Sequence, residues 1–83
     1  MRGEETYLEE RIHEALTTDG RVAEPELDVR LAGGRVFVRG TVPSVERRRA
    51  IDAVIRERFP GLEVVNETSV LPPTPKGEEE QVR

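Results

Sequence analysis

Few residues in this chain of 83 are of a type that carries out catalysis. There is no cysteine, which excludes a thiol nucleophile, a disulfide and a thiolate metal site. The only histidine, His13, follows several acids in a charged segment, and we interpret it as a surface residue rather than a base or a ligand. Ser44 has no histidine partner in any arrangement of helices and strands that the pattern allows, so we interpret it as a helix cap.

Two further patterns could hold a ligand. The acids of the first segment could contact Ca²⁺ weakly, but no loop of oxygen ligands accompanies them. These acids are Glu9, Glu10 and Glu14. The pair Gly33-Gly34 lacks the further glycine and the helix start of a phosphate-binding loop, which indicates a turn instead. We therefore expect no enzyme activity, no metal and no cofactor.

A cluster of arginines is a candidate patch for anions or anionic lipid. It consists of Arg47, Arg48, Arg49 and Arg56, with Arg58 close by. No aromatic residues are interleaved with these arginines, and carboxylates lie among them, which is also typical of a solvated helix face. The formal net charge of −4 argues against nucleic acid as a partner.

Helical periodicity predicts two helices that would position these groups. Residues 5–17 place one apolar stripe toward a core, made of Leu8, Ile12, Ala15 and Leu16. A second helix begins after the cap Ser44 and ends at Pro60-Gly61. Its stripe is made of Ala50, Ile51, Val54, Ile55 and Phe59.

Alternation with a period of two predicts three strands. The first two point Leu27, Val29, Leu31, Val36, Val38 and Val42 inward and are joined by a tight turn at Gly33-Gly34. The last strand runs from Leu62 to Leu71 and has two registers. The favoured register points Leu62, Val64, Asn66, Thr68 and Val70 inward, because the other would bury Glu67.

Glycines mark the positions where the backbone needs special freedom. Gly34 lies in the turn and Gly61 at the end of the second helix. Gly40 lies inside a strand, where a glycine typically marks a bulge or the close approach of another backbone. We expect the close neighbour of Gly40 to be a helix that crosses the sheet.

The element order α-β-β-α-β predicts an α+β fold, a two-layer sandwich of a three-stranded mixed sheet with both helices on one face. A right-handed crossover places the second helix on one face, and the first helix must bury its stripe on the same side. The opposite face is left open. By alternation that face carries Phe37, Arg39, Arg30 and Val65, which we predict to form a binding surface.

The stretch from Gly34 to Ser44, with its pattern Val36-x-Val38-x-Gly40-x-Val42, resembles the BON domain family (bacterial OsmY and nodulation). Pro60-Gly61-Leu62 and Val64-Val65-Asn66-Glu67 extend the resemblance, which covers roughly Tyr7 to Leu71. Gly40 takes the place of the family's in-strand glycine. The chain departs from the family pattern in a turn one residue short after Gly61 and in Thr68, where an aliphatic residue is usual.

The resemblance implies a non-enzymatic binding module of the envelope that contacts a phospholipid surface or a protein partner. The residues leave two classes open. One is a binding module that contacts a lipid surface or an envelope or cytoplasmic protein partner through the open sheet face. The other is a self-association module that builds dimers or rings, which would form a weak homo-oligomer. Vesicle binding and the dependence of mass on concentration would separate these classes.

The sequence predicts one domain over residues 5–71 and a tail over 72–83 that is proline-rich, then charged and disordered. No apolar run is long enough for a transmembrane segment. The first residues lack the apolar core of a secretory signal, which predicts a cytoplasmic protein as the sequence is written, or a periplasmic one if the chain is a mature or excised fragment.

Overall fold

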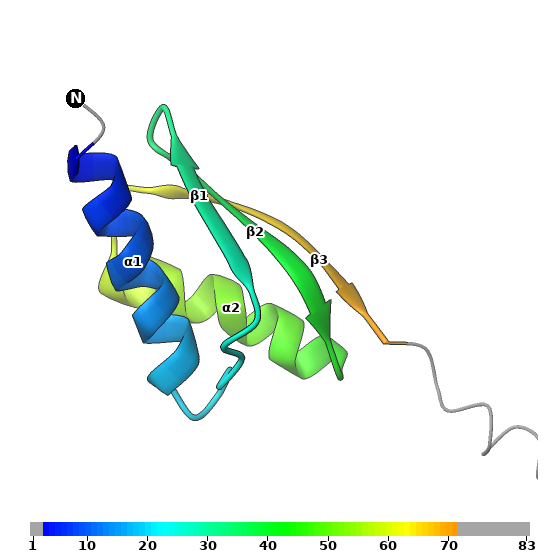
Figure 1. Ribbon diagram of the computed structural model, residues 1–83. Helices are drawn as coiled ribbons and strands as arrows, with labels where there is room; N and C mark the ends of the chain where they lie inside the picture. Colours follow the sequence, from blue (N-terminus) through cyan, green and yellow to red (C-terminus); the bar gives the residue numbers. More distant parts are fainter. Residues whose placement is uncertain (1–2, 72–83) are drawn as a thin grey trace, which may run out of the picture.

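The computed structural model describes residues 3–71, and over this range the elements follow the predicted order (Figure 1). They are α1 (Gly3–Thr18), β1 (Asp28–Ala32), β2 (Arg35–Val42), α2 (Val45–Arg58) and β3 (Glu63–Val70). Helix α1 begins two residues before the predicted start, and its first turn holds Glu4 and Glu5, whose charge favours a helix N-terminus. The predicted tail 72–83 lies outside the described residues.

The sheet is mixed, with strand order β1-β2-β3. β1 pairs with β2 antiparallel through the turn at Gly33-Gly34, and β2 pairs with β3 parallel across the connection through α2. Both helices lie on the same side of the sheet, which confirms the predicted two-layer α+β arrangement (Figure 1). Among residues 3–71 no element covers the other face.

The core lies between the sheet and the two helices, and its members follow the predicted stripes. The fully buried side chains are Ile12, Leu16, Val22, Val36, Val38, Val42, Ile51, Val54 and Ile55. The favoured register of the last strand is confirmed: Thr68 is only 5% exposed, and Val64 and Val70 pack against the core. Val22, in the connector after α1, is a core residue that no stripe predicted.

Local signals account for the turn and for the start of the second helix. Gly33 and Gly34 have φ angles of 58° and 78°, which residues with side chains rarely adopt. Ser44 caps α2 as predicted, because its Oγ accepts a hydrogen bond from the backbone N–H of Arg47 at 3.1 Å. These two features fix where β2 begins and where it gives way to α2.

The prediction that a helix lies against Gly40 is wrong. A Cβ at this position would lie 2.8 Å from Cδ2 of Leu27 and 3.6 Å from its Cα. The antiparallel register pairs Asp28 with Arg39, so its continuation brings Leu27, just before β1, opposite Gly40. Gly40 also has φ 142°. The close neighbour is therefore the chain entering β1, whose leucine turns into the core at this point.

Candidate binding surface on the open sheet face

The open face is formed by every second residue of the three strands. β2 contributes Arg35, Phe37, Arg39 and Thr41; the flanking strands contribute Asp28, Arg30, Ala32, Glu63, Val65, Glu67 and Ser69. Phe37 and Val65 are half-buried, and the polar residues are exposed. The structure thus places Phe37, Arg39, Arg30 and Val65 on one surface.

The strand register arranges this face in rows across the sheet. Arg30 pairs with Phe37 and Phe37 with Val65, so the central row is largely apolar. The next row on one side is Asp28, Arg39 and Glu67, and on the other side it is Ala32, Arg35 and Glu63. An aromatic and an aliphatic side chain therefore lie side by side between two charged rows.

Ion pairs within the sheet compensate the charges of this face. Nε of Arg39 lies 3.0 Å from Oε1 of Glu67, and Nε of Arg35 lies 3.3 Å from Oε1 of Glu63. Nε of Arg30 lies 3.5 Å from Oδ1 of Asp28. All these side chains are exposed, so each pair contributes little to stability. Three arginines face three carboxylates, and the formal charge of the surface is zero.

A shallow hollow of about 380 Å³ lies on this face beside the aromatic ring. It is lined by Asp28, Arg30, Phe37, Arg39 and Glu67. Its wall therefore offers one aromatic surface and groups of both charges.

The backbone groups at both outer edges of the sheet are partly occupied by side chains. At the β1 edge, Oε2 of Glu9 accepts the N–H of Leu31 at 2.8 Å. At the β3 edge, Oδ1 of Asn66 accepts the N–H of Thr68 at 3.1 Å. Arg48 donates to the carbonyl oxygens of Thr68 at 3.0 Å and Asn66 at 3.2 Å. Groups that could pair with a further strand are thereby used within the chain.

The arginine cluster divides between structural and exposed members. Arg47 donates to the carbonyl oxygen of Val22 and to Oε2 of Glu24, both at 2.9 Å, and Arg48 holds the edge of β3. Arg49 and Arg56 are exposed and make no hydrogen bond or ion pair within residues 3–71. Two of the four predicted patch residues thus use their donors inside the domain, and two point their charge to solvent.

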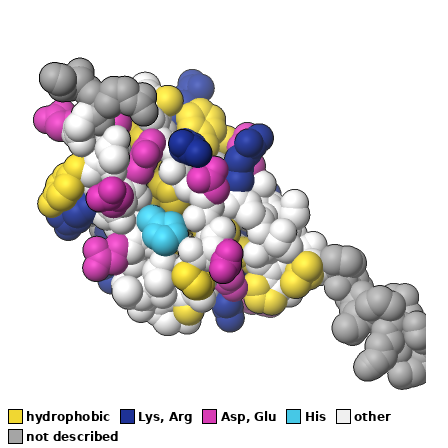
Figure 2. Space-filling view, viewed as in Figure 1, with side chains coloured by type: hydrophobic (Ala, Val, Ile, Leu, Met, Phe, Trp, Pro, Cys, Tyr) yellow, Lys and Arg dark blue, Asp and Glu magenta, His cyan; other side chains and the backbone are white. Residues whose placement is uncertain are grey.

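His13 and the acids around it lie on the α1 side of the molecule, where Figure 2 shows the histidine among Asp and Glu side chains. Nε2 of His13 donates to the carbonyl oxygen of Pro25 at 2.9 Å, which ties the connector to α1. Glu9 binds the edge of β1. No group of three potential ligands that could hold a metal occurs in the part of the chain that the structure describes.

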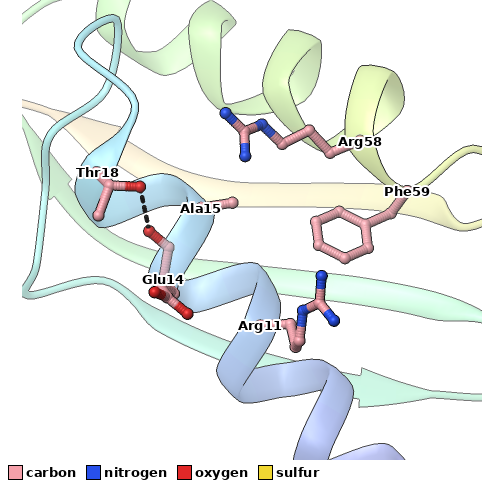
Figure 3. Close-up of a pocket in the computed structure, with 6 residues that line it drawn as sticks. All are labelled: Arg11, Glu14, Ala15, Thr18, Arg58 and Phe59. Atoms are coloured by element: carbon pink, nitrogen blue, oxygen red, sulfur yellow. Dashed lines mark hydrogen bonds between the residues drawn. The ribbon is translucent and has the colours of Figure 1, made fainter.

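A second hollow, of about 440 Å³, lies between the helices (Figure 3). It is lined by Arg11, Glu14, Ala15, Thr18, Arg58 and Phe59. Arg11 donates to the Tyr7 hydroxyl at 3.2 Å. Glu14 brings a negative charge, and the C-terminal ends of both helices add partial negative charge. The two arginines therefore do not make this hollow an anion site.

An ionic cluster joins the end of α1 to the end of α2. Arg21 donates to both oxygens of Glu57, at 3.1 and 3.0 Å, and to both oxygens of Asp19. Hydrogen bonds from Arg21, mainly from its side chain and also from its backbone N–H, lower the pKa of Asp19 from 3.8 to about 2. Hydrogen bonding to Arg21 also lowers the pKa of Glu57.

Sequence patterns alone did not reveal these polar contacts. Glu57 lies 36 positions from Arg21, and the backbone partners of Arg48 lie 20 and 18 positions away, so no local spacing marks these contacts. The pairs Arg35–Glu63 and Arg39–Glu67 share the same separation of 28 residues. That repeated spacing is a signal only once the parallel register of β2 and β3 is known.

Two helices packed on one face of a three-stranded mixed sheet, with an open face of balanced charge, form a small two-layer α+β domain. The family model of the BON domain matches residues 4–72, and the chain belongs to the BON domain family. No curated protein and no solved structure matches the chain. BON domains are a non-catalytic class of binding modules, for which phospholipid binding is the suggested role.

The helices that the structure describes bear on membrane contact in one respect. None of them is both long enough and apolar enough to cross a bilayer.

Proposed function

We propose that this chain is a non-enzymatic binding module that makes its contact through the open sheet face, and that the contact is with a protein surface. The observation that carries the proposal is the central row of that face. Phe37 and Val65 lie side by side at its middle, and all three arginines of the face are paired with carboxylates. An apolar centre with a polar rim is the usual layout of a protein interface.

The charge balance of the face decides between the two ligand classes. A surface that binds anionic phospholipid gains its affinity from unpaired lysines and arginines. Arg30 and Arg39, predicted to flank Phe37 as cations, are each within 3.5 Å of a carboxylate oxygen. Attraction to a negative membrane is therefore small at this face, and a protein with mixed charges is the better match.

The condition of the sheet edges also supports contact through the face. Self-association by edge pairing needs free backbone N–H and C=O groups along an outer strand. Glu9 occupies one such group of β1, and Arg48 and Asn66 occupy three of β3. Another protein could pair with an edge strand or pack against the open face. The backbone groups of the edges are partly occupied, whereas the side chains of the open face are available for contact.

Phospholipid contact is the second candidate function, and a different surface favours it. Arg49 and Arg56 are exposed on α2, seven residues and therefore two turns apart, so they lie on the same side of the helix. If the domain binds anionic vesicles, we expect Arg49→Gln with Arg56→Gln to weaken binding. Phe37→Ser would leave that binding unchanged.

The proposal is tested by photocrosslinking from a benzoylphenylalanine placed at Phe37 and, as control, at Arg49, in cells that express the full chain. We expect protein adducts from position 37 and few from position 49. Phospholipid adducts from 49 without protein adducts from 37 would support the second candidate. Absence of any adduct from position 37 would contradict the proposal.

A further inference from the structure

We infer that the protein bound by the open face is a second copy of this chain, packed face to face about a two-fold axis that runs parallel to the strands between β2 and β3. The inference rests on the proposed function, because it names the partner of the same surface. It differs from assembly through sheet edges, since no backbone hydrogen bond joins the two copies.

The parallel register of β2 and β3 supplies the geometry. Arg35 lies beside Glu63, Phe37 beside Val65 and Arg39 beside Glu67, each pair at the same height along the sheet. A two-fold rotation about a line midway between these strands places β2 of each copy over β3 of the other. Each arginine of β2 then faces a glutamate of the second copy, and Phe37 faces Val65.

Other two-fold arrangements of the same face bring like charges together. An axis along β2 places Arg35 of one copy opposite Arg35 of the other. An axis perpendicular to the strands at Phe37 places each strand antiparallel over the same strand of the second copy. Arg35 then faces Arg39 of the other copy, and Glu63 faces Glu67. An axis between β1 and β2 pairs Asp28 with Arg39 but leaves Arg35 opposite Ala32. The axis between β2 and β3 is the one of these four that pairs all four charges of the two strands.

The charge pattern explains why such a contact costs little to form. Each arginine already lies within 3.3 Å of a glutamate oxygen in its own chain, so the face carries no excess charge into the interface. Packed sheets lie about 10 Å apart. Long arginine and glutamate side chains can span that distance at the rim, while Phe37 and Val65 fill the centre.

The size of the contact predicts a weak complex. β2 and β3 are paired over eight residues, which corresponds to a strip about 26 Å long and about 10 Å wide. The area buried per copy is then a few hundred Å², below the roughly 800 Å² per partner of a standard protein interface. We expect dimers that appear as the concentration rises toward about 1 mM rather than a permanent dimer.

Sedimentation equilibrium of charge-reversal variants of the full chain tests the inference. Arg35→Glu with Arg39→Glu makes both strands acidic on this face, and Glu63→Arg with Glu67→Arg makes both basic. We expect each variant alone to lose the dimer, and an equimolar mixture to regain it as a heterodimer. The variant with all four changes should also dimerise, because it restores both the internal pairs and the complementarity.

A matched control and a check of folding complete the experiment. Arg49→Glu with Arg56→Glu changes the net charge as much as the first variant but lies on α2, and it should leave the dimer intact. Melting curves show whether each variant is folded. If a double variant whose charges on β2 and β3 all have one sign (a single-sign variant) does not fold, the variant with all four changes still tests the inference.

Three results would overturn the inference: a parent chain that stays monomeric up to about 1 mM, dimers in both single-sign variants, or a mixture that stays monomeric. Photocrosslinks from position 37 to another protein would in each case leave the proposed function standing. Absence of all crosslinks from that position would remove both.

Discussion

The two faces of the sheet use the same residue types for different purposes. On the side that the helices cover, Arg47 and Arg48 of α2 reach backbone carbonyl oxygens and hold this helix against the connector and the edge of β3. On the open face, Arg35 and Arg39 pair with exposed carboxylates of the neighbouring strand. The first kind of contact joins elements that would otherwise separate. The second kind joins exposed side chains and contributes little to stability, so those side chains are available for binding.

The largest loss of stability is expected at Gly40, because a side chain there would overlap Leu27 on the covered side of the sheet. Gly40→Val would place carbon atoms against Leu27 at a backbone angle that valine rarely adopts. Overpacking and backbone strain together should destabilise the domain by about 3 kcal/mol or more. Urea unfolding measures this, with Gly34→Ala as a control that has strain but open space around its Cβ. A midpoint equal to that of the parent would show that the contact with Leu27 is absent.

The next effect concerns the polar group at the edge of β3. The side chain of Asn66 donates to the carbonyl oxygen of Arg48 at 2.9 Å and to Asp52 at 3.0 Å, and it accepts from Thr68. Asn66→Ala leaves the hydroxyl of buried Thr68 without this acceptor and should cost about 2 kcal/mol. Asn66→Ala combined with Thr68→Val should recover part of the loss. A double variant that is less stable than Asn66→Ala alone would show that the loss of stability does not come from the Thr68 hydroxyl left without its acceptor.

Periodicity was enough to predict which residues of each strand point inward, because one register buries carbon and the other buries charge. It placed Thr68 inside and Phe37 outside, as the structure shows. It could not find the neighbour of Gly40, since Leu27 is brought there by strand pairing across the turn. It also treated Arg47 and Arg48 as one patch with Arg49. Only the packing of α2 shows that their donors point to opposite flanks of the helix.

A direct test of the two faces compares arginines. Arg48→Gln removes donors from two carbonyl oxygens at the β3 edge and should lower stability by about 1 kcal/mol. Arg39→Gln removes an exposed ion pair and should change it by less than about 0.5 kcal/mol. Thermal melting of both variants at the same salt concentration gives the comparison. Equal shifts would mean that the open face also holds the fold together.

The ionic cluster at the helix ends predicts a dependence of stability on pH. The pKa of Asp19 is lowered to about 2 in the folded chain, below the unfolded value of 3.8. The contribution of ionised Asp19 to the stability of the fold is therefore present above pH 3.8 and is lost as the pH falls through about 2. Asp19→Asn should flatten the stability profile in this window, measured by urea unfolding at several pH values. A parent and variant with the same slope there would contradict the role of Arg21 at this carboxylate.

A small effect on stability is also expected at the centre of the open face. Phe37 is half-buried there and no element of the described chain covers it. Phe37→Ser should lower the free energy of unfolding by less than about 1 kcal/mol. Val38→Ser, one residue along the strand and fully buried, is the matched control and should destabilise severely. Comparable losses in the two variants would place Phe37 in the core.

The claim that the open face makes the contact is tested most directly by a photoreactive residue at Val65, the neighbour of Phe37 across β2 and β3. Crosslinks from this position are recorded in the otherwise unchanged chain and in the chain that also carries Phe37→Ser, with melting curves to confirm that both are folded. We predict that protein adducts form in the first and are largely lost in the second at unchanged melting temperature. Equal adducts in both would show that Phe37 does not take part in the contact and would contradict the account.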